Sequence, residues 1–403
     1  MLDQAVVSGA NFAITLGIAR WAGSAELGMY ALAFSLLVFA GVAQESLVSL
    51  PYTIFGHRLD RDACAEYAGR TLLHQGMFSA FVVGLLGLLS TILWLGDFGP
   101  PWFGPVLHTL VAVSPFVLLR EFCRRFAFAH FWVYSALLLD STVAAAQLAC
   151  LTALAATGRL SAMTACAASG LACGLMSIVW LVLAREHFVL RLRHAIPAAA
   201  SARAFARWAF AGQLTSAAQA YSLHWLLAFR LGAELTGRFV ACESVAALSN
   251  PVVLGMASSL TPRAARAWAR EGRSGVRAVV WRGGILAGGL IGAFVLLLVA
   301  FGGDILRLLY GAELGDHRQA VIVLALGALV GVASAAIDSG LRALARPDVT
   351  FRASCLSLVV TVIGALWLLE SRDVTGAAWA FLGGRVVALM ARSVPFFRLT
   401  ADA

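Results

Sequence analysis

The sequence predicts an all-α integral membrane protein with twelve transmembrane helices in two six-helix lobes related by a pseudo-repeat. Three observations predict it: an apolar composition, twelve long apolar runs, and arginines that gather on alternate connections. Of the 403 residues, 61% are hydrophobic and 13% are charged, and the mean hydropathy is +0.85. A soluble domain is about half apolar and a quarter charged, so this composition excludes a soluble enzyme and a disordered chain.

Twelve apolar runs are long enough to cross a bilayer, which takes about 20 residues for each helix. They are expected at residues 3–22, 27–50, 71–95, 105–128, 133–157, 160–184, 206–229, 236–259, 279–302, 319–341, 350–370 and 374–397. The first run has no basic region before it and no small-residue cleavage site, so we expect a retained helix rather than a signal peptide.

The arginines predict the orientation of these spans, because basic residues stay on the cytoplasmic side of the membrane. All 30 basic residues are arginine. One set of alternate connections holds 22 of them and the other set holds seven, with Arg385 inside the last span. Both termini are therefore expected in the cytoplasm. The absence of lysine fits either a GC-rich genome or a use of arginine for phosphate recognition.

A basic, alanine-rich stretch divides the chain between the sixth and the seventh span. We expect an N-terminal lobe at residues 1–190, a cytoplasmic amphipathic linker at 191–205 and a C-terminal lobe at 206–403. A shift of 209 residues lays the seventh span on the first and aligns two glycine pairs, Gly23 with Gly232 and Gly28 with Gly237. Parallel six-helix repeats are typical of transporters, whose binding site lies between the halves near mid-membrane.

Polar residues recur on one face of the first span and again in the seventh. Asn11 lies on this face in the first span, and Gln213 and His224 lie in the seventh. Unpaired polar groups in hydrocarbon are costly, so the face either lines a cavity or packs against another helix.

Ionisable residues inside the spans are the strongest candidates for function. Glu45, Asp140, Glu243 and Arg385 lie within predicted spans. Two interpretations stay open for each of these residues. The residue binds substrate or protons, or it belongs to a structural ion pair. Glu121 and Arg125 lie one helical turn apart and are expected to neutralise each other. Arg20 and Arg230 end the first and the seventh span and are able to extend to the membrane interface.

No pattern in the sequence predicts an enzyme, a metal site or a cofactor. The cysteines and histidines are scattered without ligand spacing, and no GxxxxGK[ST] motif for nucleotide binding occurs. We expect no nucleic-acid partner. A membrane enzyme would need acid, base or nucleophilic groups in larger outer loops than this chain has.

Several stretches resemble one family of membrane proteins. The opening DQAVVSGANFAITLGIARWAGSAELGMYALAFSL, then SLVSLPYTIF, LLREFCRRFAFAH, DILRLLYGAEL and GLRALARPDVTF, are similar in matching order to the Wzx-like polysaccharide flippases of the multidrug/oligosaccharidyl-lipid/polysaccharide exporter superfamily. The resemblance implies a V-shaped fold and alternating access. It also implies a central cavity with basic residues, for which Arg20, Arg124, Arg230 and Arg385 are candidates. The mid-span aspartate of the drug-exporting relatives is absent, and Asn11 stands near that depth.

The function that the resemblance implies is movement of an undecaprenyl-diphosphate-linked oligosaccharide from the cytoplasmic to the periplasmic leaflet of the bacterial inner membrane. This step belongs to the biosynthesis of an exopolysaccharide, O-antigen or capsule, with membrane lipids, a polysaccharide polymerase and export machinery as expected partners. The energy would come from an ion gradient, for which Glu45, Asp140 and Glu243 are the candidate carriers, or from the substrate's own gradient. An ion-coupled small-molecule or multidrug antiporter is the alternative.

Overall fold

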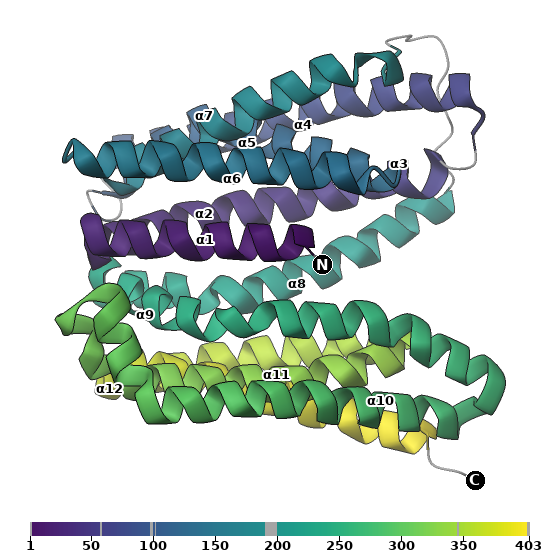
Figure 1. The fold of residues 1–403 in the computed structure, drawn as a ribbon. Coiled ribbons are helices and arrows are strands. Elements are labelled where there is room, and N and C mark those ends of the chain that lie inside the picture. The colour runs from purple at the N-terminus through teal and green to yellow at the C-terminus, as the bar shows by residue number, and fades with distance from the viewer. Residues whose placement is uncertain are drawn as a thin grey trace. The chain divides into compact units, whose positions relative to one another are not determined.

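The computed structural model describes residues 2–56, 59–96, 100, 102–189, 200–344 and 346–400. Within these ranges every regular element is a helix (Figure 1). The α-helices are α1 (Leu2–Trp21), α2 (Ser24–Gln44), α3 (Leu50–Phe55), α4 (Arg61–Gly96), α5 (Phe103–Ala129), α6 (Val133–Ala156), α7 (Ala162–Leu183), α8 (Ala200–Leu231), α9 (Ala233–Ala246), α10 (Asn250–Tyr310), α11 (Arg318–Ala343) and α12 (Pro347–Thr400). Short π or 3-10 turns join or follow some of them: η1 (Glu45–Ser49), η3 (Arg185–His187), η4 (Ala247–Ser249) and η5 (Ala312–His317).

Two of the longest helices fold back on themselves. α10 turns at Gly272, with φ 66°, and α12 turns at Asp373, with φ 46°. With α2 and α3 taken as one leg, and α9 with the first part of α10 as another, the described chain has twelve helical legs, one for each predicted span. Nine stretches of the described residues are long and apolar enough to cross a membrane, and one of them, Ala233–Tyr310, contains the Gly272 turn. The chain is a multi-pass membrane protein.

The helices cluster into two compact units, which we describe separately. The C-terminal unit holds residues 3–28 and 218–403, and the N-terminal unit holds residues 29–217. The lobe boundaries predicted from the sequence stay a proposal. Of the predicted linker at 191–205, residues 191–199 lie outside the described part of the chain, and residues 200–205 begin α8.

In the N-terminal unit, two glycines bring α7 against α5. A Cβ atom on Gly170 would lie 2.6 Å from Val113 Cγ1, and one on Gly174 would lie 2.6 Å from Phe116 Cδ1. Small residues four positions apart allow this close approach of helix backbones, which drives helix association where no hydrophobic effect acts between helices. On α5, the charged segment that follows contacts α6.

A π-helical turn, η1, interrupts the leg made by α2 and α3. Leu50 donates its backbone N–H to the carbonyl of Glu45, five residues earlier. Pro51 follows and has no N–H to continue the normal helical pattern, which gives a physical reason for the irregular turn. Such turns are common at functional sites, and this one positions the carboxylate of Glu45.

In the C-terminal unit, α10, α11 and α12 pack around one apolar cluster. Val280 and Phe396 meet over Gly340, where a Cβ atom would lie 2.8 Å from Val280 Cγ2 and 2.6 Å from Phe396 Cε2. Gly23 and Gly232, which the repeat aligns, both adopt positive φ, 98° and 91°, in the turns after α1 and α8. Only glycine adopts this conformation without strain, so both halves use the same turn.

Candidate functional site

Asp140 on α6 is the centre of a buried ion-pair network in the N-terminal unit. It is 2% exposed and contacts two arginines of α5. One carboxylate oxygen binds Arg120, and the other accepts a hydrogen bond from Arg124 Nε at 2.8 Å. A buried carboxylate needs such partners, because its desolvation is otherwise too costly.

The network continues through Glu121 to the π-helical turn. Glu121 accepts a hydrogen bond from Arg125 Nε at 2.9 Å and lies 3.4 Å from Arg124 Nη1. Arg125 reaches Glu45 on η1 at 2.9 Å. The predicted local pair of Glu121 and Arg125 is therefore present. We call these six residues the ion-pair network: Glu45, Arg120, Glu121, Arg124, Arg125 and Asp140.

The ion-pair network has three arginines and three carboxylates, so its formal charges cancel. It joins three residues that the sequence singled out separately, namely Arg124 as a substrate ligand and Glu45 and Asp140 as ion carriers. The structure gives each of them a partner of opposite charge. Their transport roles stay predictions, and the network itself links α5 to α6 and to η1.

His224 and Glu243 form a second titratable pair, in the C-terminal unit. His224 Nε2 on α8 lies 2.9 Å from Glu243 Oε2 on α9, and His224 is only 3% exposed. The imidazole ring packs between Tyr221 and Phe239, at centroid distances of 5.4 and 5.5 Å. Its Nδ1 atom is buried without a hydrogen-bond partner among the described residues. The structure thus brings together two residues that the sequence predicted separately, one as a substrate ligand and one as an ion carrier.

Arg385 lies in the second leg of α12, where its guanidinium stacks 4.9 Å from the ring centroid of Phe381. Gly331 on α11 leaves room for it, since a Cβ there would lie 3.4 Å from Arg385 Nη1. The Nε atom is buried and makes no hydrogen bond to any described residue. Among the residues that the structure describes, no carboxylate lies within ion-pair distance of Arg385. Arg385 therefore stays a candidate for binding an anion.

Arg392 extends the same face of α12 by seven residues, or two helical turns. It donates hydrogen bonds to Ser334 Oγ at 2.6 Å and to Ser354 Oγ at 2.8 Å. The sequence pattern did not single out Arg392, which lies among the arginines that predict the orientation. Its seven-residue spacing from Arg385 was the available signal. We call these two residues the α12 arginine pair.

The remaining predicted site residues are less buried. Arg20 donates to the carbonyls of Leu308 and Leu309 at 3.0 and 3.3 Å, which satisfies the end of α10. Asn11 and Arg230 are exposed on α1 and α8, and Gln213 is half-buried on α8. Their roles toward a substrate stay predictions. Among the described residues, no group of three or more histidine, cysteine, aspartate or glutamate side chains is arranged to hold a metal ion.

Comparisons with known proteins agree with this architecture. The MatE family model matches residues 223–367, which lie within the C-terminal unit. An inward-facing multidrug resistance MATE family transporter of the MOP superfamily superposes with a TM-score of 0.81 at 13% identity, covering 97% of this chain and 94% of its own. The lipid II flippase MurJ, in an inward closed conformation, superposes with a TM-score of 0.77 at 11% identity, covering 99% and 89%.

A MOP superfamily transporter from Pyrococcus furiosus, described as having a binding pocket of reverse polarity, has a TM-score of 0.68 at 14% identity and covers 100% of this chain and 94% of its own. No curated protein sequence matches this chain. At these identities the comparisons establish the fold. The chain has the fold of the MOP-superfamily membrane transporters.

Proposed function

We propose that this chain flips an undecaprenyl-diphosphate-linked oligosaccharide from the cytoplasmic to the periplasmic leaflet by alternating access, during the synthesis of an exopolysaccharide, O-antigen or capsule. The observation that carries the proposal is the half-buried side chain of Arg385, whose Nε atom is buried without a hydrogen-bond partner and which has no carboxylate within ion-pair distance among the described residues. An anionic headgroup supplies the missing charge. The fold shared with a lipid II flippase supports a lipid-linked substrate.

The α12 arginine pair suits the chemistry of a diphosphate. The charged diphosphate has to cross about 30 Å of hydrocarbon, while the polyprenyl tail stays in the lipid. Arginine donates two parallel hydrogen bonds to phosphate oxygens, which lysine does not. Arg385 and Arg392 are separated by about 10 Å along the helix axis, so a headgroup that leaves one guanidinium is already close to the next.

Glu243 is the candidate that links ion binding to substrate binding. Its carboxylate lies 2.9 Å from His224 Nε2, in the same unit as Arg385. A carboxylate–imidazole pair is chemically suited to bind and release a proton, so we assign proton coupling to this pair and substrate binding to Arg385. Glu45 and Asp140 are weaker carriers in this scheme, because arginines already neutralise them.

The alternative function is an ion-coupled small-molecule or multidrug antiporter. The fold shared with a multidrug resistance transporter and the His224–Glu243 pair favour it. Under either function we place the chain in the bacterial inner membrane with both termini in the cytoplasm. As a flippase it would work beside membrane lipids, a polysaccharide polymerase and export machinery.

The deciding experiment uses proteoliposomes that contain the purified protein and a fluorescent undecaprenyl-diphosphate-linked disaccharide. A membrane-impermeant quencher reports the fraction of the label that has changed leaflet. We expect Arg385→Gln to slow this exchange about tenfold or more, because a charge-assisted contact is lost. Arg352→Gln, at an exposed position on the first leg of the same helix, is the matched control and should leave the rate unchanged.

A second arm separates the two functions. The same proteoliposomes are loaded with a cationic dye and given a proton gradient. Dye movement without exchange of the labelled lipid would replace the flippase by the antiporter.

A further inference from the structure

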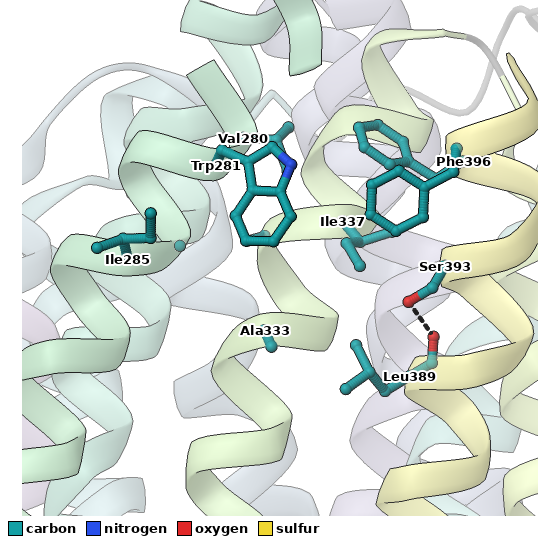
Figure 2. A pocket seen from close by; sticks show the side chains of 11 residues that line it. Val280, Trp281, Ile285, Ala333, Ile337, Leu389, Ser393 and Phe396 are labelled. Carbon is teal, nitrogen blue, oxygen red and sulfur yellow. Dashed lines mark hydrogen bonds between the residues drawn. The ribbon is translucent and has the colours of Figure 1, made fainter. Parts of the chain in front are cut away.

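An apolar groove of about 300 Å³ opens between the second leg of α10, α11 and the second leg of α12. Figure 2 shows Trp281 and Ile285 on one wall, Ala333 and Ile337 on the floor, and Phe396 on the other wall. Trp281 is 50% exposed and Ile285 is 66% exposed, so the groove is accessible from outside the helix bundle. Ser393 also lines it, but its hydroxyl is used within α12, where it bonds the carbonyl of Leu389.

Basic side chains stand at one end of this groove. The guanidinium of Arg277, one turn before Trp281 on α10, lies 5.8 Å from the ring centroid of Phe397. Trp281 packs against the same ring at 6.3 Å. Within the described ranges Arg277 makes no ion pair and no hydrogen bond, and it is exposed. Arg398, the residue after Phe397 on α12, is also exposed.

The charge pattern assigns this end of the groove to the cytoplasmic face. The turn of α10 at Gly272 and the C-terminal end of α12 lie at the same end of the C-terminal unit (Figure 1). Arginines gather at both, which the positive-inside rule associates with the cytoplasm. The inner leaflet is the one that carries anionic lipids.

We propose that the groove binds an anionic phospholipid of the inner leaflet. One acyl chain lies in the groove between α10, α11 and α12, and the phosphodiester headgroup pairs with Arg277. The occupant follows from two complementary features, an apolar groove for the acyl chain and, at its end, an arginine without an ion pair among the described residues for the phosphate. The half-exposed indole of Trp281 lies between the two, where tryptophan is favoured at a membrane interface. This site is separate from the transport step and does not rest on the proposed function.

The proposal is tested by native mass spectrometry of the full-length protein in detergent. The protein is titrated with phosphatidylglycerol and with phosphatidylcholine that carry the same two acyl chains. We expect tighter binding of phosphatidylglycerol, whose headgroup has a net negative charge, and Arg277→Gln should weaken this binding about fivefold. Phosphatidylcholine, whose ammonium group offsets its phosphate, should be weakened by less. Arg266→Gln changes another exposed arginine, on the first leg of α10, and is the matched control; it should change the binding of neither lipid.

A second pair of variants tests the acyl chain. Ala333→Phe fills the groove and should reduce the binding of both lipids. Ile285→Gln places an amide at the exposed edge of the groove and should also reduce the binding of both lipids. This variant replaces Ala333→Phe if that protein does not fold. Equal affinity of the wild-type protein for the two lipids would overturn the assignment of the headgroup. Unchanged binding in a folded groove variant would overturn the groove. Tighter binding of undecaprenyl phosphate than of phosphatidylglycerol would replace the phospholipid as occupant.

Discussion

Gly28 and Gly237 touch each other through their backbones, although 209 residues separate them in the chain. A Cβ atom on either glycine would lie 2.9 Å from the backbone nitrogen of the other. A Cβ on Gly28 would also overlap the carbonyl of Ala233, and one on Gly237 would overlap that of Ser24. Ser24 and Ala233 are related by the same shift of 209 residues. The contact between α2 and α9 is therefore reciprocal, and the predicted repeat has a physical role at this point.

Gly28→Ala should lower the stability of the protein. The added methyl group has no space, and overpacking of this kind costs about 1–3 kcal/mol. The measurement is the apparent unfolding temperature in detergent. Gly41→Ala is the matched control in the same helix, because nothing lies within 4 Å of its Cβ position. It should raise the temperature slightly, since alanine is the better helix former by about 1 kcal/mol. A Gly28→Ala variant as stable as this control would show that the helices do not touch here.

Asp140→Asn should destabilise the N-terminal unit strongly. It leaves Arg120 and Arg124 without their main counter-ion, and breaking a buried pair in this way costs about 3–5 kcal/mol. Thermal unfolding measures the loss, with the exposed Asp304→Asn as control. A stable Asp140→Asn protein that had lost only its transport activity would instead make Asp140 an ion carrier.

Arg385→Lys should retain part of the transport activity. The charge remains, but the planar fork that binds two phosphate oxygens is gone. We expect leaflet exchange of the labelled lipid to fall between those of the wild-type protein and Arg385→Gln. If lysine restored the full rate, the site would recognise charge alone. If both variants matched the wild type, Arg385 would have no part in transport.

Glu243→Gln should uncouple transport from the proton gradient. The amide has no proton to take up or release, so the pair with His224 loses its ionisable carboxylate. Leaflet exchange is measured in proteoliposomes with and without an imposed gradient. The gradient should accelerate the wild-type protein and leave Glu243→Gln unchanged. The control is Glu234→Gln on the same helix, whose exposed carboxylate pairs with Arg238. Acceleration of Glu243→Gln by the gradient would move the coupling site elsewhere.

The arginine distribution predicts which turns face the cytoplasm. A reporter enzyme fused after Gly158, in the turn between α6 and α7, should be active only outside the cytoplasm. The same reporter fused after Gly272 should be active only inside. The opposite pattern would invert the proposed topology.

Much of the helical framework follows from hydropathy, which is local along the chain. Each predicted span has a matching helical leg. The sequence repeat already aligned Gly23 with Gly232, and both lie in the turn that ends a helix. The limits of the helices were less predictable. The first leg of α10 continues through the polar stretch before Gly272. Its apolar residues Leu260 and Ala264 are buried in the same apolar cluster as Val280 and Phe396, which keeps this amphipathic segment helical.

The sequence by itself determined a multi-pass helical chain, because burial in lipid acts on each segment of about 20 residues separately. It also marked the buried charges, but not their partners. Only the tertiary structure decided that Glu45 meets Arg125, that His224 meets Glu243, and that Arg385 meets no carboxylate among the described residues. These outcomes depend on which helices pack together and in which rotation. That choice comes from contacts such as Gly170 with Val113, made between residues far apart in the chain.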